Sequence, residues 1–221
     1  MIEIEDLSKN FGAFRALSEI NLKIEKGEFT ALVGDSGSGK STLLNLIGQI
    51  DEPTEGDILI DGVSTVKMSE KEKSKLRNGK FGFVFQAFYL ESGYSVYKNL
   101  EIPLIIKGVP KKERTDIIKN ALNSVGMETK LRLTAAVLSG GEKQRVAIAR
   151  ALTCDPEIIL ADEPCGNLDS KNSKIVLDLL RDLHKKGKTI IMVTHNLTHT
   201  KYAGRVIRLS DGAVVNDIKN P

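Results

Sequence analysis

The sequence lacks the features of a membrane-spanning or secreted protein. It has no uninterrupted apolar run near the roughly 18 residues of a spanning helix. Its start, MIEIEDLSKN, lacks the basic and apolar regions of a signal peptide. The two cysteines, Cys154 and Cys165, have no CxxC spacing and no nearby histidine, which argues against a metal or redox site. We therefore expect a cytoplasmic protein whose thiols are free and reduced.

The sequence also lacks a large excess of either positive or negative charge. Lysine and arginine total 32 against 29 acidic residues, a net charge of +3, and the basic residues are interleaved with acids rather than gathered into a stripe. This argues against a nucleic-acid partner. Hydrophobic residues are 41% and charged residues 28%, as in ordinary globular proteins, and no internal repeat is visible. We expect one globular domain over residues 1–221.

Apolar runs and amphipathic segments alternate along the chain. Residues 20–24, INLKI, alternate as a half-buried strand does, whereas residues 29–33, FTALV, are continuously apolar, as in a central strand. The first is expected to pair antiparallel. A helical pattern covers residues 171–186. Further buried strands are expected at residues 80–86, 157–162 and 188–194. The pattern predicts an α/β fold with a mostly parallel sheet and an antiparallel β subdomain near the N-terminus.

Strand signals vanish between Gln86 and Asp155. Within residues 111–126, apolar side chains recur at helical spacing. We therefore predict a helical subdomain at residues 87–155, inserted into a catalytic core formed by residues 1–86 and 156–221.

Residues 34–42, GDSGSGKST, follow a predicted strand and precede a helical pattern. This is the context that the phosphate-binding motif GxxxxGK[ST] requires, and it disfavours the alternative of a simple glycine turn. Backbone N–H groups would surround phosphate oxygens, Lys40 would reach the β and γ phosphates, and Ser41 would ligate magnesium. Asp35 must point away or weaken binding. The predicted nucleotide-binding residues of this loop are Gly34, Ser36, Gly37, Ser38, Gly39, Lys40, Ser41 and Thr42.

Three polar residues end predicted strands at the carboxyl edge of the sheet, where α/β proteins bind ligands. Asp162 is predicted to anchor magnesium, and Glu163 to activate water. Alone, these acids could simply solvate a strand end, but the phosphate loop favours the catalytic interpretation. His195 is placed to bond the γ phosphate. With His199 it imitates a zinc motif, but Asn196 occupies the position of the required general base.

A second glycine pair opens another helix in residues 138–145, LSGGEKQR. Ser139 and Glu142 have the spacing of a capping box, which explains those two residues only. Gly140 and Gly141 each cost about 1 kcal/mol relative to alanine in a helix. Positions without side chains make sense if an anion approaches the backbone. Because this motif lies on the inserted subdomain, we infer that it faces a nucleotide held by a second copy of the chain.

These motifs resemble those of the ATP-binding cassette (ABC) ATPases over nearly the whole chain. In that comparison residues 138–145 are similar to the family signature, residues 158–163 to its Walker B strand, Gln86 to its Q-loop, residues 167–169 to its D-loop and His195 to its switch histidine. The resemblance implies two ATP molecules, with magnesium, sandwiched in a homodimer.

The resemblance also suggests roles for residues that are ambiguous alone. Gln86 would contact magnesium or water. Asp169, which could merely cap a helix, would contact the partner across the dimer. Glu142 would lie at the partner's nucleotide with the rest of the signature. Phe11 would stack on adenine, although a strand-end aromatic is more often a core residue.

The sequence is most similar to the branch that contains macrolide exporters, lipoprotein-release ATPases and antimicrobial-peptide exporters. Cys165 stands where that branch usually has threonine. The resemblance implies a subunit, peripheral on the inner face of a bacterial membrane, that hydrolyses ATP to drive a separate permease docked near residues 87–104. Its work would be export or extraction of a peptide, lipoprotein or lipophilic compound. The alternative is an ATP-gated signalling module that acts on a membrane partner without transport. A soluble ABC ATPase of DNA repair or translation is disfavoured, because no long coiled-coil insertion is present.

Overall fold

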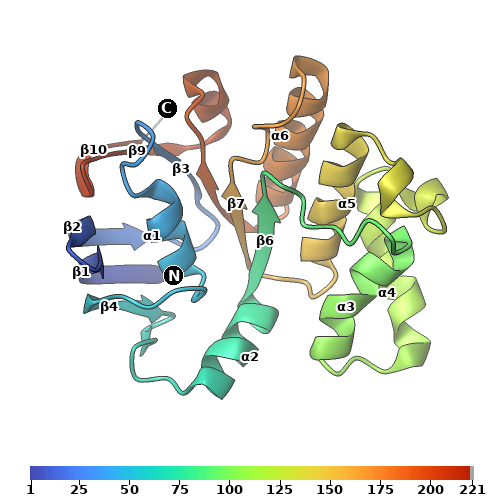
Figure 1. Cartoon of the computed structure of the whole chain (residues 1–221), viewed down its shortest axis with the longest axis horizontal. Coiled ribbons are helices and arrows are strands. Elements are labelled where there is room, and N and C mark those ends of the chain that lie inside the picture. Colours follow the sequence, from blue (N-terminus) through green and yellow to red (C-terminus); the bar gives the residue numbers. More distant parts are fainter. Residues whose placement is uncertain (220–221) are drawn as a thin grey trace.

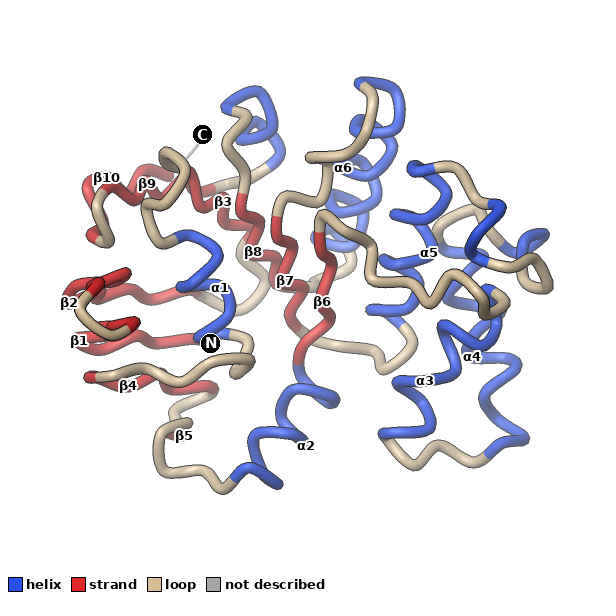
Figure 2. The backbone as a smooth tube through the Cα atoms, in the orientation of Figure 1, coloured by secondary structure: helices blue, strands red, loops and turns tan. Residues whose placement is uncertain are grey.

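Two β-sheets and a separate group of helices make up the fold (Figures 1 and 2). The computed structural model describes residues 1–219, so the last two residues of the predicted domain lie outside the described residues. The first sheet is antiparallel, with strand order β2-β1-β4-β5. Its strands are β1 (Ile2–Phe11), β2 (Phe14–Ile24), β4 (Glu55–Ile60) and β5 (Val63–Ser64).

The second sheet has six strands in the order β10-β9-β3-β8-β7-β6 and is parallel except between β9 and β10. The strands are β3 (Phe29–Val33), β6 (Phe81–Phe85), β7 (Ile158–Asp162), β8 (Thr189–Val193), β9 (Arg205–Ser210) and β10 (Ala213–Lys219). All five residues of β3 are buried, and β3 lies between β8 and β9, which explains its unbroken apolar run. The predicted α/β class, with a mostly parallel sheet and an N-terminal antiparallel sheet, is confirmed.

Helix α1 (Lys40–Ile47) lies between the two sheets (Figure 1). One hydrophobic cluster joins Leu43 and Leu44 of this helix to Leu7 of β1 and to Leu160 of β7. Both flanks of α1 are therefore packed against a sheet, which fixes the helix that follows the phosphate loop.

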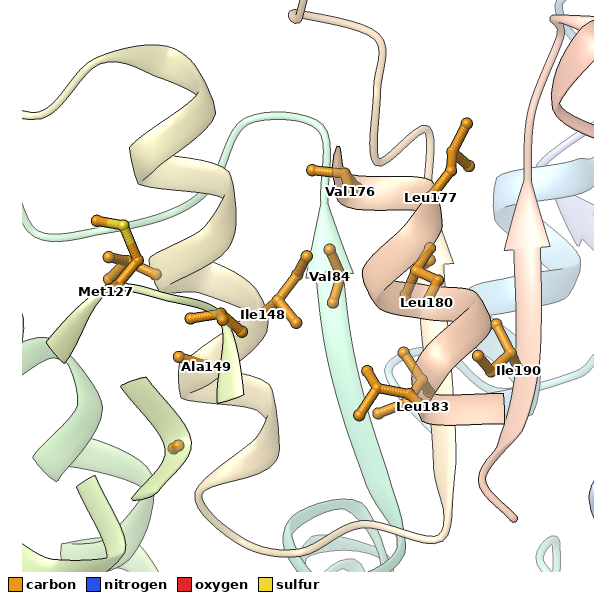
Figure 3. Packing of buried hydrophobic residues seen from close by; sticks show 14 of the residues in the cluster. Val84, Met127, Ile148, Ala149, Val176, Leu177, Leu180, Leu183 and Ile190 are labelled. Carbon is orange, nitrogen blue, oxygen red and sulfur yellow. The ribbon is translucent and has the colours of Figure 1, made fainter. Parts of the chain in front are cut away.

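A second hydrophobic cluster fills the other face of the parallel sheet (Figure 3). Helix α6 (Ser170–Lys185) contributes Val176 and Leu180 to it, and helix α5 (Gly140–Leu152) contributes Ile148. Figure 3 shows Val84 of β6 between these two helices. The cluster thus joins the parallel sheet to the helical side of the molecule.

Residues 87–155 contain no strand of either sheet among the described residues. Helix α4 (Lys111–Ser124) falls within the predicted helical pattern at 111–126, and α3 (Val96–Ile106) and α5 lie beside it in Figure 1. None of the helices within residues 1–219 is both long enough and apolar enough to cross a membrane. The remaining helices are α2 (Glu70–Lys80) and the short 3₁₀ turns η1 (Glu128–Lys130), η2 (Ala135–Val137) and η3 (Leu197–Tyr202).

Candidate functional site

The glycine-rich loop connects β3 to α1 and is tightly held. Gly39 has a φ of 97°, and a Cβ atom there would lie 2.7 Å from the backbone oxygen of Ala16, so both conformation and space favour glycine. The Lys40 ammonium group is buried and donates to the Asp35 backbone oxygen (2.6 Å) and to Ser38 Oγ (3.3 Å). Lys40 is therefore hydrogen-bonded to the main chain of Asp35, and Asp35 itself is exposed to solvent.

Ser41 and Asp162 meet at the base of this loop. Ser41 Oγ, in the first turn of α1, donates to Asp162 Oδ1 at 2.9 Å. Burial raises the pKa of Asp162 above its ordinary value, and the neighbouring Glu163 carboxylate acts in the same direction. A bound cation would offset this cost of burying the charge. Asp162 is the last residue of β7, and in the sheet it is paired with Phe85 of β6 on one side and with Val193 of β8 on the other.

The oxygen donors near Ser41 fit one particular kind of metal site. No cluster of three or more His, Cys, Asp or Glu side chains that could hold a metal occurs within residues 1–219. One carboxylate, one hydroxyl and the amide of Gln86 instead suit a magnesium ion that takes its other ligands from phosphate oxygens and water. The residues present therefore fit magnesium bound together with a nucleotide.

Glu163 and His195 form a hydrogen-bonded pair at the adjacent ends of β7 and β8. Glu163 Oε1 accepts from the His195 backbone N–H at 2.9 Å, and His195 Nδ1 lies 2.8 Å from the same oxygen. Because an ionised carboxylate only accepts hydrogen bonds, the second contact is a hydrogen bond when Nδ1 carries a proton. Glu163 has a φ of 45°, and backbone strain in a residue other than glycine is concentrated at functional sites.

A cavity of about 450 Å³ brings the predicted residues together. Phe11 lines it and is 51% exposed, so it belongs to neither hydrophobic cluster. The predicted residues Gly34, Ser38 and Asp162 do not line it, although Asp162 is hydrogen-bonded to Ser41 on its wall. The predicted residues on the cavity wall are Phe11, Ser36, Gly37, Gly39, Lys40, Ser41, Thr42, Gln86, Glu163 and His195.

Three wall residues, Phe14, Ala16 and Val193, were missed by the sequence analysis. Phe14, 62% exposed, and Ala16 lie at the start of β2 and line the cavity beside Phe11. Phe14 pairs with Phe11 across the β1–β2 turn. Directly paired residues share one face of a hairpin, so two aromatics flanking the short turn at Gly12 were the available signal.

The second glycine pair lies away from this cavity. Ser139 and Glu142 form the predicted capping box, and the Ser139 backbone N–H, with help from Lys130, lowers the pKa of Glu142 to about 2. A Cβ atom at Gly140 would meet only ordinary van der Waals contacts, the nearest at 3.8 Å from Leu168, so no contact within the chain requires glycine there. A Cβ atom at Gly141, by contrast, would lie 2.1 Å from Asn172 Oδ1, so contacts within the chain also favour this glycine.

Comparison with known proteins agrees with this geometry. Residues 17–166 match the family described as ABC transporter. The chain belongs to the ABC transporter ATP-binding cassettes. It is 46% identical to an uncharacterized ABC transporter ATP-binding protein of Methanocaldococcus jannaschii, over 99% of both chains. It is 43% identical to a macrolide export ATP-binding/permease protein of Aggregatibacter actinomycetemcomitans, matching 100% of this chain but only 36% of that protein.

The cassette is also close to solved structures. A bacterial ABC transporter cassette in dimeric form superposes with a TM-score of 0.91 at 41% identity, covering 99% of this chain and 98% of that one. A dimeric cassette in a post-hydrolysis state with ADP and phosphate gives a TM-score of 0.90 at 40% identity, with the same coverage. The chain is thus an ABC ATPase, and it spans about a third of the length of the macrolide export relatives.

Asp169 of the cassette caps helix α6, as one of its two predicted roles requires. Its Oδ1 accepts from the Asn172 backbone N–H, and its Oδ2 accepts from Asn172 Nδ2, both at 2.8 Å. These hydrogen bonds lower the pKa of Asp169. Neither Asp169 nor any residue of the segment 138–145 lines the cavity around Lys40.

The two cysteines of the cassette are free and buried. Burial raises the pKa of both thiols, that of Cys165 to about 12. Cys165 lies two residues after Glu163, and its Sγ contacts the Ser173 backbone oxygen at 3.7 Å. A thiol with such a pKa stays protonated at neutral pH and is a poor nucleophile.

Proposed function

We propose that this cassette binds magnesium-ATP in the cavity around Lys40 and that two copies close over two nucleotides. One observation carries the proposal. The phosphate loop, Glu163 and His195 share one cavity, whereas Gly140 is exposed to solvent outside it. In a symmetric pair, the Ser139–Glu142 segment of each chain would face the γ phosphate held by the other. The dimeric state of the related cassettes supports this arrangement.

The side chains then divide the work of hydrolysis. Lys40 places its ammonium group on the β and γ phosphates, and Ser41, Asp162 and Gln86 hold magnesium, which when bound offsets phosphate charge. Glu163 accepts the proton of the attacking water. His195 donates to a γ-phosphate oxygen through Nε2, and because Nδ1–H is held by Glu163, this requires the imidazolium form. Phe11 and Phe14 offer flat apolar faces for adenine.

The partner surface is proposed to lie on the helical side of the cassette. A cavity of about 390 Å³ opens between α2, β6 and α3, lined in part by Phe83, Ile102 and Ile106. Ile106, just after the predicted docking segment 87–104, is 68% exposed, and Tyr89 within that segment is 66% exposed. Apolar side chains exposed together mark an interaction site. Docking there would hold the cassette at the inner face of the membrane, beside a separate permease.

The sandwich has a direct test in mixed dimers. Lys40→Ala removes one chain's phosphate contact, and Gly140→Arg fills the space that the opposite nucleotide needs. Each variant alone is expected to form no ATP-dependent dimer. An equimolar mixture contains pairs with one intact composite site, so light scattering should detect ATP-dependent dimer that retains one nucleotide. A mixture that behaves as the sum of two inactive variants would contradict the shared site.

Transport is proposed as the function that ATP hydrolysis drives. The macrolide export relatives are named ATP-binding/permease proteins, and the cassette matches about a third of their length. Liposomes containing the cassette with its membrane subunit are expected to move a radiolabelled macrolide or a lipid-modified peptide when ATP is added. Glu163→Gln should stop the movement. Normal ATPase activity without movement of either probe would favour the signalling function instead.

A further inference from the structure

The side chains of Gln86 and Asn167 form a reciprocal amide pair. Asn167 Nδ2 donates to the backbone oxygen of Gln86 at 3.0 Å, and Gln86 Nε2 donates to Asn167 Oδ1 at 3.2 Å. The two residues are 81 positions apart in the sequence. The pair therefore connects the end of β6 to the segment that precedes α6.

These two hydrogen bonds fix which end of each amide points where. A backbone oxygen can only accept, so Asn167 must direct its NH₂ group toward Gln86 O, and its Oδ1 faces the Gln86 side chain. Gln86 must then present Nε2 to Asn167. No protein group within residues 1–219 donates to Gln86 Oε1, and Gln86 lines the same cavity as Ser41. The amide oxygen, the atom that magnesium prefers, is left available.

Gly166 makes this arrangement possible. A Cβ atom at Gly166 would lie 2.7 Å from Gln86 Nε2 and 2.8 Å from Gln86 Cδ. Its φ is outside the left-handed region, so the backbone itself does not demand glycine. What excludes a larger residue is the side chain of Gln86, which lies against the main chain at Gly166.

A third amide holds the two segments at fixed positions. Gln144 of α5 is fully buried, and its Nε2 donates to the backbone oxygens of Pro164 (2.7 Å) and Phe85 (3.3 Å). Phe85 directly precedes Gln86, and Pro164 lies two residues before Gly166. With both strand ends tied to the same helix, the Gln86 side chain meets Asn167 in a defined geometry.

We propose that Asn167 is a positioning residue that orients the Gln86 amide so that its oxygen, and not its nitrogen, faces the magnesium side of the cavity. This rests on the proposed role of Gln86 as a magnesium contact. The general reason is that a partner hydrogen-bonded to the far side of a ligand holds that ligand in its binding orientation, and its loss typically weakens metal affinity at least tenfold. Asn167 itself touches neither nucleotide nor metal in this scheme.

The test is the affinity for ADP, measured by titration calorimetry once with Mg²⁺ and once with EDTA. Asn167→Ala and Gly166→Ala are each expected to reduce the affinity gained from Mg²⁺ by about tenfold. Metal-free ADP binding should remain at the wild-type value, because the phosphate loop is untouched. Gly79→Ala serves as the matched glycine control, since nothing lies within 4 Å of its added Cβ and its φ is not left-handed.

A double-mutant cycle separates positioning from a structural effect. If Asn167 acts through Gln86, Asn167→Ala should have no further effect on the Mg²⁺-dependent gain in a Gln86→Ala chain. An undiminished effect there would overturn the proposal, as would equal losses with and without Mg²⁺. If Gln86→Ala alone leaves the gain unchanged, the magnesium role of Gln86 is wrong and the inference falls with it. If only Gln86→Ala has an effect, the inference alone fails.

Discussion

Replacing Glu163 by glutamine is expected to abolish ATP turnover while ATP binding persists and the dimer accumulates. The amide keeps the shape of the side chain, and its oxygen can still accept from the His195 backbone N–H, which is 2.9 Å from Oε1 in the wild-type chain. It cannot take a proton from water. Loss of a general base costs about a hundredfold to ten-thousandfold in rate. Phosphate release measures the rate, and light scattering with ATP measures the dimer.

Glu113→Gln is the matched control for this prediction. Glu113 lies in the first turn of α4 and is exposed, so its substitution should leave turnover unchanged. A Glu163→Gln chain that stays monomeric at every ATP concentration would count against the sandwich. Turnover within a few-fold of wild type would instead remove Glu163 from the proposed mechanism.

Lys40→Ala is expected to weaken nucleotide binding itself. The buried ammonium group is held in the loop by the Asp35 backbone oxygen and by Ser38 Oγ, at the position where a β- or γ-phosphate oxygen is proposed to lie. Hydrogen bonds to charged groups contribute about 1.5–3 kcal/mol. The dissociation constant for magnesium-ATP should therefore rise roughly tenfold to a hundredfold, which titration calorimetry can measure.

A second buried lysine separates loss of binding from loss of folding. Lys73 of α2 is also buried and pairs with Glu52, and neither residue lines the cavity. Lys73→Ala should lower the melting temperature without changing nucleotide affinity. Unchanged affinity in Lys40→Ala would contradict the role of Lys40, whatever happens to its stability.

The parts of the fold that the sequence predicts are those with strong local patterns. The continuously apolar run of β3 and the helical spacing in α4 and α6 were sufficient. Helix α2 was missed because its residues form no apolar face, and the one buried side chain is Lys73. Its signal was the Ser69–Glu72 capping box. The β9–β10 hairpin was also missed, although Asp211-Gly212, both with positive φ, marks a tight turn.

For the site, the motifs predict most of the residues that line the cavity, because short loops between β-strands and helices place them. They do not predict contacts between distant segments. Asn172 against Gly141 and Asn167 against Gln86 depend on how α5 and α6 pack on the sheet, and that packing leaves no local pattern. The roles assigned to individual site residues remain predictions that the variants above address.

The position of α1 between two sheets has a consequence for any attempt to shorten the protein. The family match begins at residue 17, and a fragment cut there would retain every motif from Gly34 to His195. It would lose β1, and with it Leu7, which packs in the same cluster as Leu43 and Leu44. One face of α1, the helix that carries Lys40 and Ser41, would then be exposed to water. The amino-terminal hairpin is therefore as much a part of the catalytic unit as the loop it supports.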